Sequence, residues 1–424
     1  MARRSLLALL AGLVCLPAVA SAGDDPAPAP APADAGSVEG LAKGERDFAF
    51  DLHRLLAAKG GNVFASAYSV STALAMTAVG ARGPTSDELR KALHLPEGYG
   101  PRYREFAKSV TSIPMVREYE DGKQGPVERP AYSLSIANAI FSQQGWKFLD
   151  PFRKSVADDF LAEFRELDFK NPPEARAAIN DWVAKKTKDR IKDIVPEGMP
   201  TPDTKMALAN AIHFKANWDE EFSEKGTTDA PFHTGAGKDV TSKRMRRVGH
   251  YGYVETPDAQ IVEMRYKSGE TSMVVVLPKA KDGLAAIEKT VNGGTFATWM
   301  GALGSKRVDV QFPKFTVTST FELVKPLGDL GVKAAFLPSA DFSGIVPPPQ
   351  PLYIGAILHK AFVAVDEKGT EAAAATVVMM RTGSAMNPEA PVAFVVDHPF
   401  LFAIRHVPTG AILFLGRIDD PTAP

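Results

Sequence analysis

The side chains that most readily exchange protons or bind metals near neutral pH are histidines, and the chain has eight of them in 424 residues. They are scattered without the spacing of zinc ligands, and no H-E-x-x-H pair occurs. The sequence also lacks a G-x-S-x-G nucleophile turn, a phosphate loop ending in G-K-[ST] and a dinucleotide-binding glycine fingerprint. We therefore expect no enzyme, no cofactor and no metal site.

Residues 366–384 (DEKGTEAAAATVVMMRTGS) have a different potential function, because their sequence is compatible with more than one backbone structure. Gly369 and the alanines after it fit helix, strand or coil, whereas the Thr-Val-Val that begins at Thr376 favours a strand. In a strand, both Glu371 and Arg381 would lie on one face. The opposite face would carry no charge, since it holds Thr370, Ala372, Ala374, Thr376, Val378 and Met380.

Two interpretations of this segment follow from its composition. The simpler one is a short Ala-rich helix that leads into the Gly, Ser, Asn and Pro-rich surface loop at 383–391. The other is a two-state element, which is tolerated as an exposed loop and is also sound as a buried strand.

The surrounding pattern predicts the elements that would position this segment. Apolar residues at helical spacing predict helices over 44–56, 69–80 and 175–195, and a short helix starting at Ser86. Buried or alternating runs predict strands over 132–141, 207–214, 272–277, 307–312, 361–366 and 400–404. Helices gathered early and strands gathered late indicate an α+β domain with substantial antiparallel sheet.

The N-terminus has the pattern of a secretory signal. Arg3 and Arg4 precede an apolar run, and residues 20–22 (ASA) supply a small-residue cleavage site, so we predict a signal peptide over 1–22. The run is short for a membrane span. Cys15 raises the alternative of a lipid anchor, but Val14 stands where a lipoprotein motif needs Gly or Ala. We therefore expect secretion, either extracellular or periplasmic, without an anchor.

Beyond the signal we expect one folded domain. Residues 23–38 are rich in Ala and Pro and hold no large apolar residue before Val38, which predicts a semi-rigid linker. No second linker or repeat follows, which predicts a single domain over 39–424. Cys15 is the only cysteine, so disulfides cannot stabilise it. The formal charge of −1 argues against nucleic acid as a partner.

The segment at 366–384 resembles the reactive-loop hinge of inhibitory serpins, and the resemblance continues across residues 39–418. Asn210 to Lys215 followed by Trp218 looks like the family's central strand. The motifs at 62–69, 312–315, 340–344 and 359–362 also match in order and spacing, and 394–402 (FVVDHPFLF) fits the family signature. The chain is thus identified as a member of the serpin family on several motifs that together are specific.

The resemblance implies a serpin fold, in which helices pack on a large central mixed sheet accompanied by smaller sheets, with an exposed reactive loop at about 367–391. It also implies a monomeric suicide inhibitor of serine proteases, with cysteine proteases as the alternative class. The target would attack the loop to form a covalent 1:1 acyl-enzyme, and the cut loop would insert into the main sheet. The competing interpretation is a non-inhibitory serpin-fold binding, carrier or chaperone protein.

The resemblance also assigns site residues. Counting from Glu367, the reactive bond falls at Gly383–Ser384, and Arg381–Thr382 is the alternative. The expected hinge consists of Glu367, Gly369, Thr370, Glu371, Ala372, Ala373, Ala374, Ala375 and Thr376. A cluster that gates sheet opening would contain Ser66, Ser69, Asn210 and His359, against the simpler interpretation that His359 is a core residue bonded to a backbone carbonyl. Trp218 and Lys314 would lie at the insertion point, with Lys314 paired to Glu367.

Overall fold

The structure is a computed structural model that describes residues 37–119, 125–370 and 390–423. Residues 34–424 form one compact unit. The described part combines helices with mixed sheets, which confirms the predicted α+β class. The predicted signal peptide, nearly all of the predicted linker and the reactive loop from Glu371 to 389 lie outside the described residues.

The early helices precede most of the strands, as the sequence pattern indicates. The helix α2 shows why the pattern works, because Ser66 accepts a hydrogen bond from the Ser69 N–H at its start and Gly80 ends it. The α-helices among the described residues are α1 (Val38–Ala57), α2 (Ala67–Val79), α3 (Gly83–Ala92), α4 (Gly100–Thr111), α5 (Asp150–Phe160), α6 (Pro172–Lys186), α7 (Leu284–Thr290), α8 (Gly293–Gly301) and α9 (Val324–Asp329).

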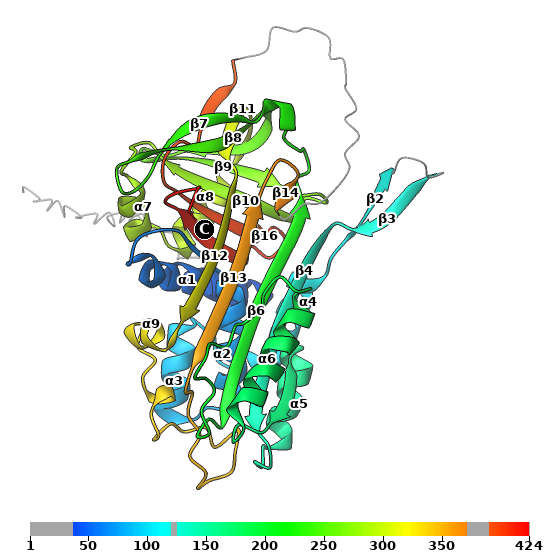
Figure 1. Ribbon diagram of the computed structural model, residues 1–424, viewed down its shortest axis with the longest axis vertical. Coiled ribbons are helices and arrows are strands. Elements are labelled where there is room, and N and C mark those ends of the chain that lie inside the picture. The colour runs from blue at the N-terminus through cyan, green and yellow to red at the C-terminus, as the bar shows by residue number, and fades with distance from the viewer. Residues whose placement is uncertain (1–36, 120–124, 371–389, 424) are drawn as a thin grey trace, which may run out of the picture. The chain divides into compact units, whose positions relative to one another are not determined.

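A six-stranded sheet with long strands runs through the fold (Figure 1). Its strands lie in the order β12 (Phe315–Glu322), β13 (Ile357–Val365), β14 (Gly369–Thr370), β6 (Met206–Asn217), β4 (Tyr132–Gln143) and β5 (Glu163–Leu167). Strand β13 pairs with β6 in parallel and β4 pairs with β5 in parallel, whereas β4 and β6 are antiparallel. This is the expected mixed sheet.

The expected smaller sheets are joined into one nine-stranded sheet by hydrogen bonds that run through β8. Its path is β1 (Val63–Ala65), β17 (Ile412–Ile418), β16 (Phe400–His406), β10 (Thr271–Pro278), β9 (Ala259–Arg265), β8 (Asp239–Glu255), β11 (Gly304–Pro313) and β15 (Val392–Val395), with β7 (Thr228–His233) paired to β8. A two-stranded ribbon, β2 (Met115–Tyr119) with β3 (Pro126–Pro130), completes the strands described.

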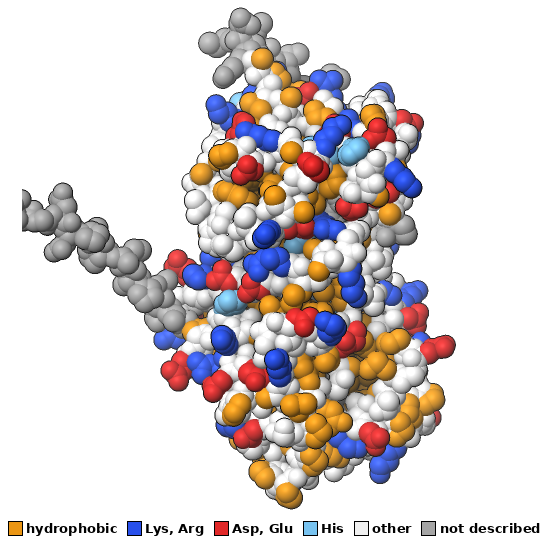
Figure 2. All heavy atoms as spheres, turned by 90° about the vertical axis from the view of Figure 1, so that its left-hand side faces the viewer, with side chains coloured by type: hydrophobic (Ala, Val, Ile, Leu, Met, Phe, Trp, Pro, Cys, Tyr) orange, Lys and Arg blue, Asp and Glu red, His pale blue; other side chains and the backbone are white. Residues whose placement is uncertain are grey.

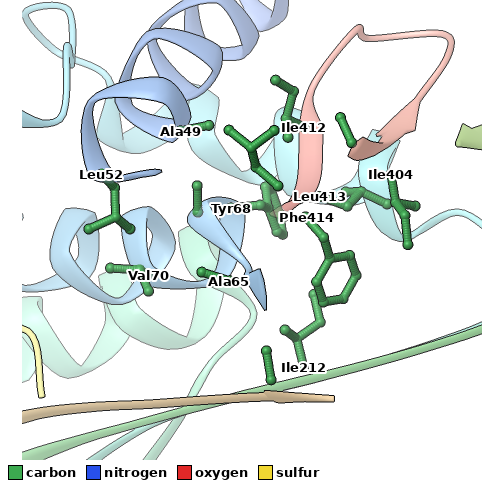
Figure 3. Packing of buried hydrophobic residues seen from close by; sticks show 14 of the residues in the cluster. Ala49, Leu52, Ala65, Tyr68, Val70, Ile212, Ile404, Ile412, Leu413 and Phe414 are labelled. Carbon is green, nitrogen blue, oxygen red and sulfur yellow. The ribbon is translucent and has the colours of Figure 1, made fainter. Parts of the chain in front are cut away.

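The six-stranded sheet is buried on both faces. One face packs on the main core, where side chains of α1, α2, β6 and β17 meet, among them Leu52, Val70, Ile212 and Phe414 (Figure 3). The other face packs under α6, against a second apolar cluster that includes Ile179, Trp182 and Val183 together with Ala209 and Ala211 of β6. Burial on both faces explains why β6 is a nearly continuous apolar run in the sequence.

Three predicted boundaries are corrected by the structure. The helix predicted over 175–195 ends at Lys186, because Lys188 and Asp189 have left-handed backbone angles (φ 52° and 61°) that a helix cannot continue. Ile191 and Ile194 keep the apolar spacing because they remain buried under the sheet. The predicted linker is shorter at its end, since Ser37 caps α1 and Val38 begins it. The helix predicted from Ser86 begins earlier, at Gly83.

The surface carries charges of both signs. On the face shown in Figure 2, basic and acidic side chains are interspersed rather than gathered into a region of one sign. Among the described residues, no helix is both long enough and apolar enough to cross a bilayer.

Candidate functional site between β13 and β6

The strands β13 and β6 are joined in two different ways along their length. Over five consecutive pairs, from Ile357↔Leu208 to Ala361↔Ile212, they are direct parallel neighbours, and we call this stretch the closed section. At the other end, β14 lies between them: Thr370 pairs with Val365 on one side and Ala216 on the other. We call this stretch the open end.

A tight turn delivers β14 to the open end. The Asp366 carboxylate accepts hydrogen bonds from the backbone N–H groups of Lys368 (2.9 Å) and Gly369 (3.1 Å), and the Asp366 N–H donates to the Gly369 carbonyl (2.9 Å). An Asp at the first position of a turn commonly bonds its own backbone in this way. The chain therefore reverses within three residues of leaving β13 and enters the sheet again beside it.

Only glycine fits at position 369. A Cβ placed there would lie 2.0 Å from the Ala216 carbonyl oxygen and 2.8 Å from the Asn217 Cα. Such contacts with backbone atoms cannot be relieved by a rotamer change. The predicted hinge residue Gly369 is thus required by the close approach of two backbones at the open end.

Trp218 fixes the turn from the side. Its indole Nε1–H donates to the Asp366 carbonyl (3.0 Å), and its backbone N–H donates to the Lys368 carbonyl (2.8 Å). The Phe222 N–H donates to the Glu367 carbonyl (2.8 Å). The Trp218 ring is fully buried and stacks on Tyr266 with centroids 4.6 Å apart. The structure therefore places Trp218 against the turn that leads into β14.

Glu367 and Lys314 form the predicted ion pair. Lys314 Nζ donates to Glu367 Oε2 (2.7 Å), while the Thr227 hydroxyl donates to Oε1 (2.7 Å). Although partial burial acts in the opposite direction, these hydrogen bonds hold the pKa of Glu367 below its ordinary value. Glu367 is ionised at neutral pH, and its side chain is only 9% exposed.

Thr370 points into the core at the open end. It is 1% exposed, and its hydroxyl lies 2.7 Å from that of Tyr266, which is also buried. Burial raises the pKa of Tyr266 well above its ordinary value, so its hydroxyl remains protonated. Residues 367–370 were predicted as the start of an exposed loop, and this is wrong for Glu367, Gly369 and Thr370, because the turn and β14 bury all three.

The predicted cluster of Ser66, Ser69, Asn210 and His359 is brought together at the closed section. The Ser66 N–H donates to His359 Nε2 (3.0 Å), so the ring proton is on Nδ1, which donates to Asn210 Oδ1 (3.0 Å). The Asn210 amide donates in turn to the Ser69 carbonyl. His359 is therefore bonded to a side chain and a backbone N–H, and not to a backbone carbonyl as the simpler interpretation held.

Burial determines the charge of this cluster. His359 is fully buried, and burial lowers its pKa from 6.5 to about 4. The imidazole is thus neutral at physiological pH, as acceptance of a hydrogen bond at Nε2 requires. The Ser66 hydroxyl also donates to the Leu413 carbonyl (2.7 Å), which links the cluster to β17.

Sequence reasoning missed Asn138, Tyr266 and Thr227. Asn138 of β4 accepts from the Asn210 amide (2.6 Å) and the Ser69 hydroxyl (3.4 Å), and so belongs to the cluster. A single amide inside the apolar strand pattern of 132–141 was the signal that could have identified it, because a buried amide needs partners. Tyr266 and Thr227 had no such signal, since their partners Thr370 and Glu367 are distant in sequence.

The hinge residues Glu371 to Thr376 and both candidate reactive bonds, Gly383–Ser384 and Arg381–Thr382, lie outside the described residues. The chain is described again before β15 starts at Val392, one residue past the predicted end of the loop. Within the described ranges, no group of His, Cys, Asp or Glu side chains is arranged to hold a metal ion.

Comparison with known proteins places this geometry in a family. Residues 43–421 match the family model "Serpin (serine protease inhibitor)". An uncharacterised serpin-like protein of Thermococcus kodakarensis is 37% identical, over 88% of this chain and 84% of its own length. The leukocyte elastase inhibitor of Bos taurus is 36% identical, over 91% of this chain and all of its own. The crystal structure of human thyroxine-binding globulin with its ligand aligns with a TM-score of 0.78 at 28% identity, over 91% of this chain and all of that one.

Proposed function

The chain belongs to the serpin family, and on that premise we propose that it is a secreted suicide inhibitor of serine proteases and not an enzyme. The observation that carries the proposal is the seating of Gly369 and Thr370 between β13 and β6. The loop that follows Thr370 is thus attached to a strand that has already begun to enter the sheet. Continued insertion needs only that the closed section opens along the same line.

The register of β14 supports the path of insertion. Each further residue of the loop would lie one residue earlier on β6 and one residue earlier on β13, so Thr376 would come between Asn210 and His359. Thr370 faces the core, and the alternate residues Ala372, Ala374 and Thr376 would face it as well. None carries a charge, which removes the main energetic obstacle to burial.

The reaction would be an interrupted proteolysis. The target's serine attacks the carbonyl of the reactive bond, the peptide nitrogen leaves with a proton, and an acyl-enzyme ester forms. The freed loop end then inserts before water hydrolyses the ester. Strand β6 is 12 residues long, so insertion along it carries the ester about 40 Å. Displacement on that scale would distort the protease's catalytic site.

Both candidate bonds suit this path. By the same register, Met380 would lie opposite Met206, the first residue of β6. Arg381 would therefore follow directly after the last residue that β6 can pair, and Gly383 would lie two residues beyond it. A Gly before the cut suits elastase-like or subtilisin-like proteases, and an Arg suits trypsin-like ones.

A second candidate is a binding or carrier protein without inhibitory activity. It is favoured by the similarity to thyroxine-binding globulin, a serpin-fold structure solved with a small ligand. The two candidates differ in what happens to the protease. An inhibitor, itself a monomer, would retain the protease in a covalent 1:1 complex, whereas a carrier would merely be cleaved.

One SDS gel experiment distinguishes these two candidate functions. Mixed in turn with subtilisin, elastase and trypsin, the protein should give a band of complex size that survives boiling in SDS. Sequencing the released C-terminal fragment should give Ser384 for the first bond or Thr382 for the alternative. If all three proteases cut the loop and remain fully active, the inhibitory proposal is wrong.

Thr370→Arg tests the route of insertion. The Thr370 side chain is buried and bonded to Tyr266, so an arginine there should stop insertion and turn the inhibitor into a substrate. Thr370→Ser retains the hydroxyl and is the matched control. The measurement is the number of inhibitor molecules consumed per protease inactivated, which should rise at least several-fold for Thr370→Arg alone.

A further inference from the structure

An apolar cavity of about 240 Å³ lies beside the closed section, on the side of the six-stranded sheet that α6 covers. Its floor belongs to both strands, because Leu358 of β13 and Ala209 of β6 are register partners and both line the cavity. The other floor residues are small, namely Ala207 of β6 with Gly355 and Ala356 just before β13. The floor therefore spans the two strands that the closed section joins.

The roof of the cavity comes from α6 and from the segment after it, which has neither helix nor strand. It consists of Ile179 of α6 and of Ile194, Val195, Met199 and Pro200 beyond the helix. The aliphatic roof residues belong to the same apolar cluster as Ala207, Ala209 and Leu358 of the floor. Ala207 and Leu358 nevertheless remain partly exposed, so the space between floor and roof is incompletely filled.

The polar residues of the lining call for no charged or hydrogen-bonding ligand. The Thr201 N–H donates to the Thr204 hydroxyl (3.0 Å), and Lys205 Nζ lies 5.8 Å from the centre of the Trp146 ring. The exposed Asp203 offsets the charge of Lys205. No side chain of the lining has a buried polar atom without a hydrogen-bond partner. The lining, all of it within the described ranges, thus suits an uncharged apolar molecule.

The size and the entrance of the cavity narrow the class of ligand. An engineered protein cavity of about 150 Å³ with an apolar lining holds benzene, so the larger volume here suits a molecule of about ten carbon atoms. Such a molecule could enter without unfolding of the sheet, because Thr201 and Tyr353 of the lining are exposed. Tyr353 is 39% exposed, and a bound molecule would cover part of its ring.

We propose that this cavity binds a small uncharged apolar molecule and that the bound molecule holds β13 against β6. A molecule in contact with both Leu358 and Ala209 favours, by mass action, the state in which these two residues remain paired. The binding itself does not depend on the proposed function. Only its consequence, slower insertion of the loop while the molecule is bound, rests on that function.

Naphthalene is a probe of the right size, and 2-naphthoate is its charged counterpart. Near saturation, naphthalene should raise the melting temperature of the full chain by a few degrees. We expect 2-naphthoate to bind at least tenfold more weakly, because the apolar lining would leave a buried carboxylate unpaired. Equal binding of the two would contradict the uncharged class, and a chain that binds neither would overturn the proposal.

Ala209→Leu tests the location of the site. The leucine would fill part of the cavity, so the free protein should melt no lower than the wild type, and naphthalene should bind at least tenfold more weakly. Ala207→Leu is a second variant of the floor, in case Ala209→Leu impairs folding. Ala177→Leu is the matched control, since Ala177 is exposed on α6 and does not line the cavity. Full binding by both floor variants, or an equal loss in the control, would show that naphthalene binds elsewhere.

Amide exchange tests whether the bound molecule holds the two strands together. With naphthalene, exchange of Leu358 to Ala361 should slow several-fold, whereas exchange of Ile136 to Phe141 on β4, at the other edge of β6, should be unchanged. Equal slowing in both strands would mean that the molecule stabilises the whole fold without acting on the closed section. These measurements use the uncleaved chain without a protease, so their outcome is independent of whether the chain inhibits one.

Discussion

The open end and the closed section are made by the same two strands, yet different groups hold them. At the open end, β13 and β6 are separated by Gly369 and Thr370, and the polar contacts involve a turn, Trp218 and a partly exposed ion pair. In the closed section they bond directly to each other, and the side-chain contacts belong to the buried cluster around His359. One end has already admitted a strand and the other excludes it.

On the proposed mechanism, this difference indicates where resistance to insertion lies. The main-chain hydrogen bonds broken between β13 and β6 are replaced when a strand enters, because that strand pairs with both neighbours. The buried bond between His359 and Asn210 has no such replacement in the backbone, and it spans the line along which the strands must part. We therefore expect substitutions in the closed section to lower the free energy of unfolding more than substitutions at the open end.

Asn210→Ala should have the largest effect. It leaves His359 Nδ1 without its buried acceptor and removes the bonds that the Asn210 amide donates to the Ser69 carbonyl and to Asn138, which should cost about 3 kcal/mol in the free energy of unfolding. Urea unfolding measures the loss, and amide exchange of Leu358 to Ala361 should accelerate. Asn217→Ala, on the same strand at the open end, is the control and should change unfolding by less than half as much.

A fall in pH should lower the stability of the fold through the same cluster. His359 has a pKa of about 4 in the folded chain and an ordinary value of 6.5, so the unfolded chain binds the proton more tightly. Its contribution to stability is complete above pH 6.5 and is lost as the pH falls towards 4. Between pH 7 and pH 5 the wild type should lose about 2 kcal/mol more than His359→Gln.

The comparison with the variant is needed because other groups titrate in the opposite sense. Burial raises the pKa of Glu45 from 4.5 to about 8, so this carboxyl stabilises the fold increasingly as the pH falls from 8 to 4.5. Its contribution is the same in both proteins and cancels in the difference. Parallel pH curves for the wild type and His359→Gln would show that His359 does not titrate as its burial requires.

Lys314→Ala should have the smallest effect. The Lys314 side chain is 37% exposed and Glu367 keeps its bond from Thr227, so the loss should be about 0.5 kcal/mol and should vanish in high salt. Urea unfolding at low and high ionic strength checks both points. A loss as large as that of Asn210→Ala would remove the distinction between the two ends.

Local patterns predicted the elements that depend on local physics. The caps of α2 and the strand β6 follow from residue type and spacing, and the ion pair of Lys314 with Glu367 followed from the resemblance. The end of α6 was missed because Ile191 and Ile194 keep a helical spacing and stay buried, although their backbone is irregular. A periodic pattern thus indicates which residues are buried, but it does not determine whether a helix or another backbone conformation buries them.

The site residues that were missed share one physical cause. Asn138 and Tyr266 matter because each meets a group far away in the chain, and no local preference selects that partner. Thr370 was assigned to an exposed loop because the composition of residues 366–384 fits an exposed loop and a buried strand equally. Its position is decided by the space between Val365 and Ala216, which exists only once β13 and β6 are in place.

On the proposed mechanism, the closed section has a consequence for the kinetics of inhibition. Each acyl-enzyme would have two fates, hydrolysis at a rate set by the protease and insertion at a rate set by how fast β13 separates from β6. A change of about 1.4 kcal/mol in the barrier to that separation changes the second rate tenfold. The same loop would then inactivate a protease that deacylates slowly and yet be consumed as a substrate by a faster one, without any difference in how well either enzyme recognises the reactive bond.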